Sequence, residues 1–219
     1  MRQFRETGMQ AVFFLAACIS VLSVIFICAF LFSAGLPAIQ EIGWGNFLFG
    51  IEWRPSNQIF GILPMIIGSV YVTFGALVIG VPIGILTALF LAFFCKEKWY
   101  PIFKRAVSLM AGIPSVVYGF FGLVVLVPFV RNYVGGHGMG VLTASILLGI
   151  MILPTIISVS EASLRAVPES YYQGGLALGA SHEQSIFFVV LPAARRGILA
   201  SVILGLGRAM GETMAVIMV

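Results

Sequence analysis

The sequence predicts an all-α protein, a polytopic bundle of transmembrane helices. Of its 219 residues, 60% are hydrophobic and only 9% are charged, and the mean hydropathy is +1.10. A fold in water could not cover so much apolar surface with so little charge. Apolar runs near the ~20 residues that cross a hydrocarbon core of about 30 Å recur along the chain, and five such spans fit into it.

The first predicted span covers residues 11–34 and follows Arg2 and Arg5. A secretory signal also begins with basic residues, but its apolar core is only about 7 to 15 residues long, so we expect this longer segment to stay in the membrane. Residues 36–57 carry charges and tryptophans. We expect an exposed loop there, anchored by its aromatic rings at the lipid headgroups.

The apolar stretch over residues 60–94 predicts the second span. As one straight helix it would be about 52 Å long, more than the membrane needs. The stretch must therefore break or tilt. Pro64 and the run Gly80-Val81-Pro82-Ile83-Gly84 predict breaks, with an interfacial piece first and the span itself over residues 69–94. Because broken backbone at membrane depth must be buried in protein or line a cavity, the region of Pro82 is either a pathway wall or a packing kink.

Three more spans are predicted: one over residues 106–130, one that follows a short loop over residues 131–138 and ends near residue 160, and one over residues 197–219. With the N-terminus in the cytoplasm, nine basic residues fall in cytoplasmic segments and two in outside loops. This excess predicts the orientation. The nine are Arg2, Arg5, Lys96, Lys98, Lys104, Arg105, Arg165, Arg195 and Arg196, and the two are Arg54 and Arg131.

Several classes of function lack their motifs in this sequence. There is no G-x-x-x-x-G-K-[ST] phosphate cradle, so we expect no nucleotide hydrolysis by a P-loop. His182-Glu183-Gln184-Ser185-Ile186 begins like a zinc-protease helix but has Ile where the second His is required. We therefore expect a protein that is not an enzyme and has no metal and no cofactor. The basic residues lie between apolar runs instead of in a stripe, so nucleic acid is not an expected partner.

Residues 161–196 predict a compact helix-turn-helix in the cytoplasm. Pro168 and Glu169 suit a helix start, and Gly179 suits its stop. Ser181 and Gln184 have the spacing of a capping box, which opens a second short helix that ends near residue 192.

Part of this segment resembles a pattern in the permeases of ABC importers. Their cytoplasmic loop before a late span carries E-A-A, three residues, G, nine residues, I, one residue and L-P. The resemblance implies that the loop couples the chain to an ATPase subunit; the alternative is an ordinary cytoplasmic connector. At the same spacing this chain has Val189 and the six implied coupling residues Gln173, Gly174, Gly175, Gly179, Leu191 and Pro192. Gln in place of Glu still forms hydrogen bonds but carries no charge.

Other segments, from about residue 60 to the end, resemble the phosphate permeases of the PstC and PstA type, and the last of them is closer to PstC. The resemblance implies the type I ABC importer (MetI-like) permease fold, lacking its last helix. It also implies an N-terminal helix and outside loop over 1–59 and a truncated permease domain over 60–219, with the coupling loop over 161–196. The segments are Gly61-Ile62-Leu63-Pro64, 112–119, 152–157, 164–168 and 207–216, which includes Glu212-Thr213-Met214-Ala215-Val216.

The same resemblance implies partners, location and function. The partners are a second, PstA-like permease subunit, a dimer of PstB-like ATPase subunits and an external PstS-like phosphate-binding protein. The chain is expected to cross a bacterial inner membrane several times, in contact with its lipid, and to translocate inorganic phosphate into the cytoplasm by alternating access. Two alternatives stay open. One is another oxyanion such as sulfate or molybdate; the other is an ion-coupled secondary transporter, whose inverted hydropathy repeat we do not find.

Two charged residues fall inside the fifth predicted span. Arg208 lies about 16 Å into it, and Glu212 follows one turn later on the same face. A charge at that depth costs from about 3 to more than 10 kcal/mol, so the two either neutralise each other or serve a pathway. Gly207 and Gly211 form a small-xxx-small surface for a partner helix. We therefore expect Arg208 and Glu212 at an interface between two permease subunits, facing the pathway.

An arginine suits phosphate because its planar fork donates two parallel hydrogen bonds to an oxyanion. Glu212 would hold the fork when no anion is present, or accept a proton from the substrate. Several neutral donors are candidates for the rest of the shell, with helix–helix contact as the alternative role for each. They are Ser115, Tyr118, Thr155, Ser158 and Thr213.

Overall fold

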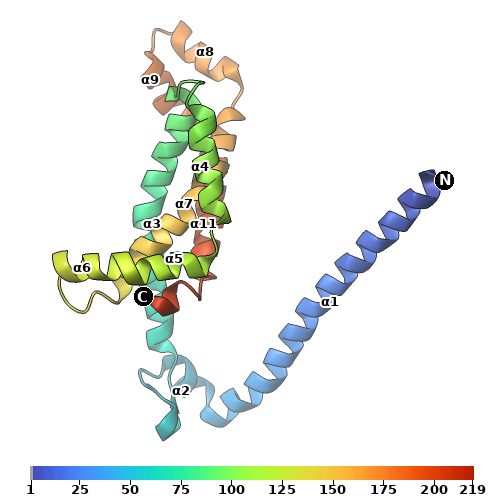
Figure 1. Cartoon of the computed structure of the whole chain (residues 1–219), viewed down its shortest axis with the longest axis vertical. Coiled ribbons are helices and arrows are strands. Elements are labelled where there is room, and N and C mark those ends of the chain that lie inside the picture. The colour runs from blue at the N-terminus through green and yellow to red at the C-terminus, as the bar shows by residue number, and fades with distance from the viewer. Residues whose placement is uncertain (1) are drawn as a thin grey trace. The chain divides into compact units, whose positions relative to one another are not determined.

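The computed structural model describes residues 2–219, with side chains from Gly8 onward (Figure 1). The chain forms two compact units that meet in sequence at Ile66 and Ile67. Each is described by itself.

The N-terminal unit begins with one long helix. α1 spans Arg2–Ile42, and α2 spans Trp44–Phe49. β1 (Trp53–Arg54) and β2 (Ile59–Phe60) pair antiparallel around a 3-10 turn over Pro55–Asn57. The predicted loop from residue 36 is wrong as far as Ile42, because the helix continues through its internal proline. The helix ends before Gly43, whose φ of 86° lies in the left-handed region that favours glycine.

The second span is continuous, so the predicted breaks are wrong. α3 spans Leu63–Leu89 and runs on through a π-helical turn over Phe90–Phe94. Pro64 lies in the first turn of α3, where its missing N–H would have no helical partner. The glycines around Pro82 allow close packing: a Cβ on Gly80 would lie 2.8 Å from Ile152, and one on Gly84 2.6 Å from Ile156. These contacts support a packing role for the region of Pro82 over a broken pathway wall.

The third predicted span, by contrast, is divided. α4 (Tyr100–Gly112) ends at Ile113, and α5 (Ser115–Phe121) begins after Pro114. A π-helical turn over Gly122–Leu126 and α6 (Val127–Tyr133) follow. Ile113 is extended, with ψ 126°, because the proline ring disfavours helical backbone at the residue before it. In Figure 1, α5 and α6 run across the direction of α4.

The core of the second unit forms around α7 (Val141–Arg165). The side chains of Leu147, Ile152 and Ile156 are fully buried on it. α11 (Arg195–Met210) packs along α7 through small residues: a hydroxyl–hydroxyl hydrogen bond of 2.7 Å joins Ser160 to Ser201. Small residues of this kind let helix backbones approach closely in a membrane.

The predicted helix-turn-helix is confirmed. α8 (Glu169–Ala177) starts directly after Pro168, and the chain turns at Gly179 with φ 86°. α9 (His182–Ser185) carries the complete Ser181–Gln184 capping box. A π-helical turn over Ile186–Val190 and α10 (Leu191–Ala193) lead into α11. In Figure 1 this segment lies at the same end of the second unit as the connection between α3 and α4.

Four segments of the described chain are long and apolar enough to cross a membrane, namely Gly8–Ile42, Leu63–Phe94, Ser115–Tyr133 and Val141–Arg165. A fifth candidate is the bent pair His182–Ala193 and Arg195–Met210, which meet at 68°. The predicted helix over 197–219 is therefore wrong in its second half. α11 ends at Met210, and only a 3-10 turn over Val216–Met218 is helical beyond it.

Candidate translocation and coupling sites

Arg208 lies in the last turn of α11 and is half-buried. Its Nη1 donates a 3.3 Å hydrogen bond to the Thr155 hydroxyl. Thr155 is near the middle of the 25-residue α7, so Arg208 lies level with the middle of a membrane-spanning helix. The structure thus brings together two of the residues predicted for the pathway.

Glu212 does not pair with Arg208. Because α11 ends at Met210, Glu212 is not one turn further on the same helical face, and that prediction is wrong. Its Oε1 instead accepts a 3.4 Å hydrogen bond from the backbone N–H of Ala215. Within the described residues, Arg208 forms no ion pair, and its one side-chain hydrogen bond is to Thr155.

The remaining predicted donors have different surroundings. Tyr118 is buried, and its hydroxyl donates to the carbonyl of Met110 at 2.9 Å, so it ties α5 to the end of α4. Ser115 is the half-buried first residue of α5, and Thr213 is exposed after the end of α11. Neither forms a hydrogen bond with Arg208 in the described chain.

The six predicted coupling residues belong to one compact element, but they differ in exposure. Gln173 is exposed on α8 and donates to Glu169 at 3.1 Å. Gly174 beside it is open, whereas Gly175 is buried: a Cβ there would lie 2.7 Å from the Ser185 hydroxyl of α9. The absence of a side chain at Gly175 therefore allows α8 and α9 to pack closely together. Gly179 forms the turn between them, Leu191 packs in a buried cluster, and Pro192 is exposed on α10.

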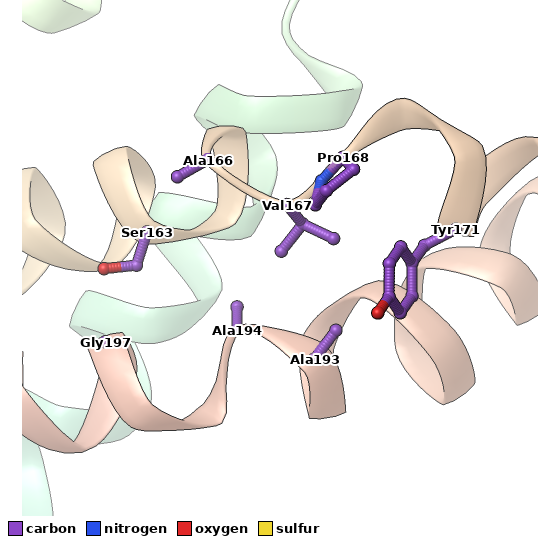
Figure 2. A pocket seen from close by; sticks show the side chains of 8 residues that line it. All are labelled: Ser163, Ala166, Val167, Pro168, Tyr171, Ala193, Ala194 and Gly197. Atoms are coloured by element: carbon purple, nitrogen blue, oxygen red, sulfur yellow. The ribbon is translucent and has the colours of Figure 1, made fainter.

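A groove of about 350 Å³ lies at the base of this coupling element. Figure 2 shows that Ala166, Val167 and Pro168 form one side and that Ala193, Ala194 and Gly197 form the other. Tyr171 of α8 points across its end (Figure 2). Because nearly all of these side chains are small, they leave the space between α8 and the start of α11 unfilled.

A buried charge cluster surrounds Glu161, a residue that the sequence pattern had predicted to lie in a polar connecting segment. Glu161 lies inside α7 with only 2% of its side chain exposed. Its Oε1 accepts from the Tyr100 hydroxyl at 2.6 Å and from Arg165 Nε at 3.1 Å, and its Oε2 accepts from Lys104 at 2.6 Å. The available signal was the four-residue spacing of Glu161 and Arg165, which places both on one face of a helix if the fourth span continues past residue 160. We call Tyr100, Lys104, Glu161 and Arg165 the Glu161 cluster.

Residues 80–219 match the family model described as "Binding-protein-dependent transport system inner membrane component". The chain belongs to this family. Its members are transport subunits of ABC importers in the bacterial inner membrane and not catalytic enzymes, as expected. A permease of this family works with an ATPase, a second permease subunit and a substrate-binding protein.

Individual relatives agree with the family assignment. The permease is 38% identical to the probable ABC transporter permease YqgH of Bacillus subtilis, over all of this chain and 72% of that protein. It is 36% identical to the phosphate transport system permease PstC of Mesorhizobium japonicum, over 85% of this chain and 63% of the relative. The corresponding values for PstC of Xylella fastidiosa are 33%, 86% and 67%. The predicted resemblance to PstC is confirmed.

A solved structure confirms the predicted fold class. The permease superposes with a TM-score of 0.54 on a chain of the MetNI methionine ABC transporter in inward-facing conformations. The two share 26% sequence identity, over 69% of this chain and 68% of the other. The helical arrangement is therefore of the MetI-like type.

Proposed function

We propose that this permease translocates inorganic phosphate into the cytoplasm by alternating access, in an ATP-driven importer. Its partners would be a PstA-like second permease, a PstB-like ATPase dimer and an external PstS-like phosphate-binding protein. The observation that carries the proposal is Arg208, half-buried level with the middle of α7 and without an acidic partner among the described residues.

An arginine in this position is costly unless another group compensates its charge. The Thr155 hydroxyl accepts a hydrogen bond from one nitrogen of the Arg208 guanidinium at 3.3 Å. The rest of the fork is available to donate to an oxyanion, which supplies both the countercharge and a matching geometry. On this proposal Glu212, whose carboxylate accepts a long 3.4 Å bond from the backbone N–H of Ala215, would bind the fork between transport events.

The exposed side of α11 supports a second permease subunit as the covering partner. Leu199, Ile203 and Met210 are each more than half exposed there. Gly207 has no atom within 4 Å of the place a Cβ would occupy. An apolar helix face with a glycine at its centre suits close approach by another helix. On this proposal, Arg208 faces a pathway between the two permeases, and Ser115, Tyr118, Thr155, Glu212 and Thr213 are its other pathway residues.

Phosphate is favoured over sulfate or molybdate by the relatives named PstC, because the fork alone fits any tetrahedral oxyanion. The orientation belongs to the same proposal, with the N-terminus and the coupling loop 161–196 in the cytoplasm. The division of the chain into an N-terminal helix and loop over 1–59 and a permease domain over 60–219 is also part of this proposal.

The test is uptake into proteoliposomes that contain the permease and its three kinds of partner. We expect phosphate uptake that requires ATP and that excess sulfate or molybdate does not reduce. Competition by either anion would reassign the substrate. Uptake driven by an ion gradient without the ATPase would instead favour a secondary transporter.

A further inference from the structure

The Glu161 cluster joins three helix ends beside the coupling element. We propose that it is a clamp through which movement of α8 reaches α4, and that Glu161 is a positioning residue for coupling. The proposal rests on the ATP-driven import proposed above. In the described residues 67–219, both ion pairs belong to this cluster.

The carboxylate of Glu161 is held by both oxygens. Tyr100 and Arg165 donate to Oε1, and Lys104 donates to Oε2 at 2.6 Å. A rotation of the side chain would break at least one of these bonds. Because the group is buried, losing a charged partner would leave an uncompensated charge, so the arrangement is strongly preferred over looser ones.

The donors to Glu161 come from different helices. Tyr100 and Lys104 lie in the first two turns of α4, and Arg165 is the last residue of α7. Arg165 also donates from Nη2 to the carbonyl of Leu91 at 2.9 Å, in the π-helical turn that ends α3. Its guanidinium carbon lies 4.7 Å from the centre of the Tyr100 ring. The ends of α3, α4 and α7 are thereby fixed to one another.

α8 begins only four residues after Arg165, at Glu169. On its other side, α8 faces the groove of about 350 Å³ lined by small side chains (Figure 2). A push on α8 therefore meets free space toward α11, while the short link over residues 166–168 joins α8 to the end of α7, which the cluster bonds to α3 and α4. The movement is transmitted on the bonded side.

From α4 the contacts continue toward the proposed pathway. The Tyr118 hydroxyl bonds to the carbonyl of Met110 across the break at Pro114. Tyr118 then packs in one buried cluster with Ala209, which is next to Arg208 in the chain. A continuous chain of contacts couples the two sites only if the ATPase side and the pathway side both shift the same movement of the helices. An experiment must therefore measure that movement.

The direct test is the distance between α4 and α7 in the assembled complex. Spin labels at Ser108→Cys and Ala162→Cys, both exposed positions, would be placed in a background without Cys18, Cys28 and Cys95. With Glu161 present we expect one narrow distance distribution, unchanged when nucleotide is trapped. With Glu161→Gln we expect a broader distribution that shifts with nucleotide. An unchanged narrow distribution in Glu161→Gln would overturn the clamp.

The functional test is the amount of phosphate imported per ATP hydrolysed, corrected for assembled complex. We expect Glu161→Gln and Lys104→Gln each to lower this ratio by about tenfold or more, which is the scale of losing one hydrogen bond to a charged group. The double variant should be no worse than Glu161→Gln, because contacting residues act as a unit. Glu97→Gln, an exposed carboxylate between α3 and α4, is the matched control and should leave the ratio unchanged.

Parallel loss of uptake and ATP hydrolysis would show an ordinary stabilising role and overturn the proposal. If the complex without substitutions imports no phosphate, the proposed function fails by itself. The distance between α4 and α7 does not depend on the substrate, so it still decides the clamp.

Discussion

At the residue scale, Arg208 shows what the sequence could and could not predict. Its position in an apolar span was enough to single it out as a candidate pathway residue, because a charge at that depth is costly unless it is compensated. Its partner was predicted wrongly: the i, i+4 spacing to Glu212 assumed a helix that ends at Met210. The actual partner, Thr155, is 53 residues away on α7, and no local pattern encodes such a contact.

We expect Arg208→Lys to abolish phosphate uptake while the complex stays assembled. Lysine keeps the charge but loses the planar fork that donates two parallel bonds. Uptake and subunit pull-down would be measured together, with the exposed Arg105→Lys on α4 as the matched control. The double variant Arg208→Ala with Glu212→Ala should also assemble and stay inactive. Near-normal uptake in the double variant would leave both residues without a role in transport.

At the element scale, the coupling element was predicted well because its signals are local. A proline start, a glycine turn and a capping box each act within one helical turn, so tertiary contacts do not override them. The proline-containing spans were predicted poorly for the opposite reason. Pro82 stays inside a helix that packs on α7, whereas Pro114 ends one. That difference depends on neighbours far away in the chain.

The two adjacent glycines of α8 give a sharp test of its packing. We expect Gly175→Ala to lower the apparent melting temperature of the solubilised permease, since its Cβ would meet the Ser185 hydroxyl at 2.7 Å; overpacking of this kind costs about 1–3 kcal/mol. Ser185→Gly in the same chain should restore most of the loss, because that buried hydroxyl has no hydrogen-bond partner among the described residues. Gly174→Ala, with nothing within 4 Å, is the control and should not destabilise. Equal effects at both glycines would contradict this packing.

A second prediction for this element concerns its turn. Gly179 has φ 86° and open space around it, so a substitution there strains the backbone without a steric clash. We expect the assembled complex with Gly179→Leu to hydrolyse ATP through its ATPase subunits without importing phosphate, because strain of about 1–2 kcal/mol would shift α8. Gly179→Asn should remain coupled, since asparagine tolerates this conformation better. Normal transport by the leucine variant would show that the turn does not position the coupling element.

At the scale of the whole molecule, orientation follows from where the charged segments gather. In the second unit, the α3–α4 connection and the coupling element lie at one end, and the loop between α6 and α7 lies at the other (Figure 1). The first end carries Lys98 and the basic residues around it, whereas the second has Arg131 and His137. Cytoplasmic loops carry the excess of Lys and Arg, so the end with Lys98 is expected inside.

We therefore expect an impermeant thiol reagent on intact cells to label His137→Cys and to spare Lys98→Cys. Both side chains are exposed in the fold, so a difference in labelling reports the side of the membrane and not burial. The background must lack Cys18, Cys28 and Cys95. Permeabilised cells supply the control, because both positions should then react equally. α1 is a single continuous helix, so two predicted spans, α1 and α3, separate the N-terminus from the α3–α4 connection that carries Lys98. Sparing of Lys98→Cys therefore also favours an N-terminus in the cytoplasm. Preferential labelling at Lys98→Cys would reverse the orientation and place the coupling element out of reach of ATP.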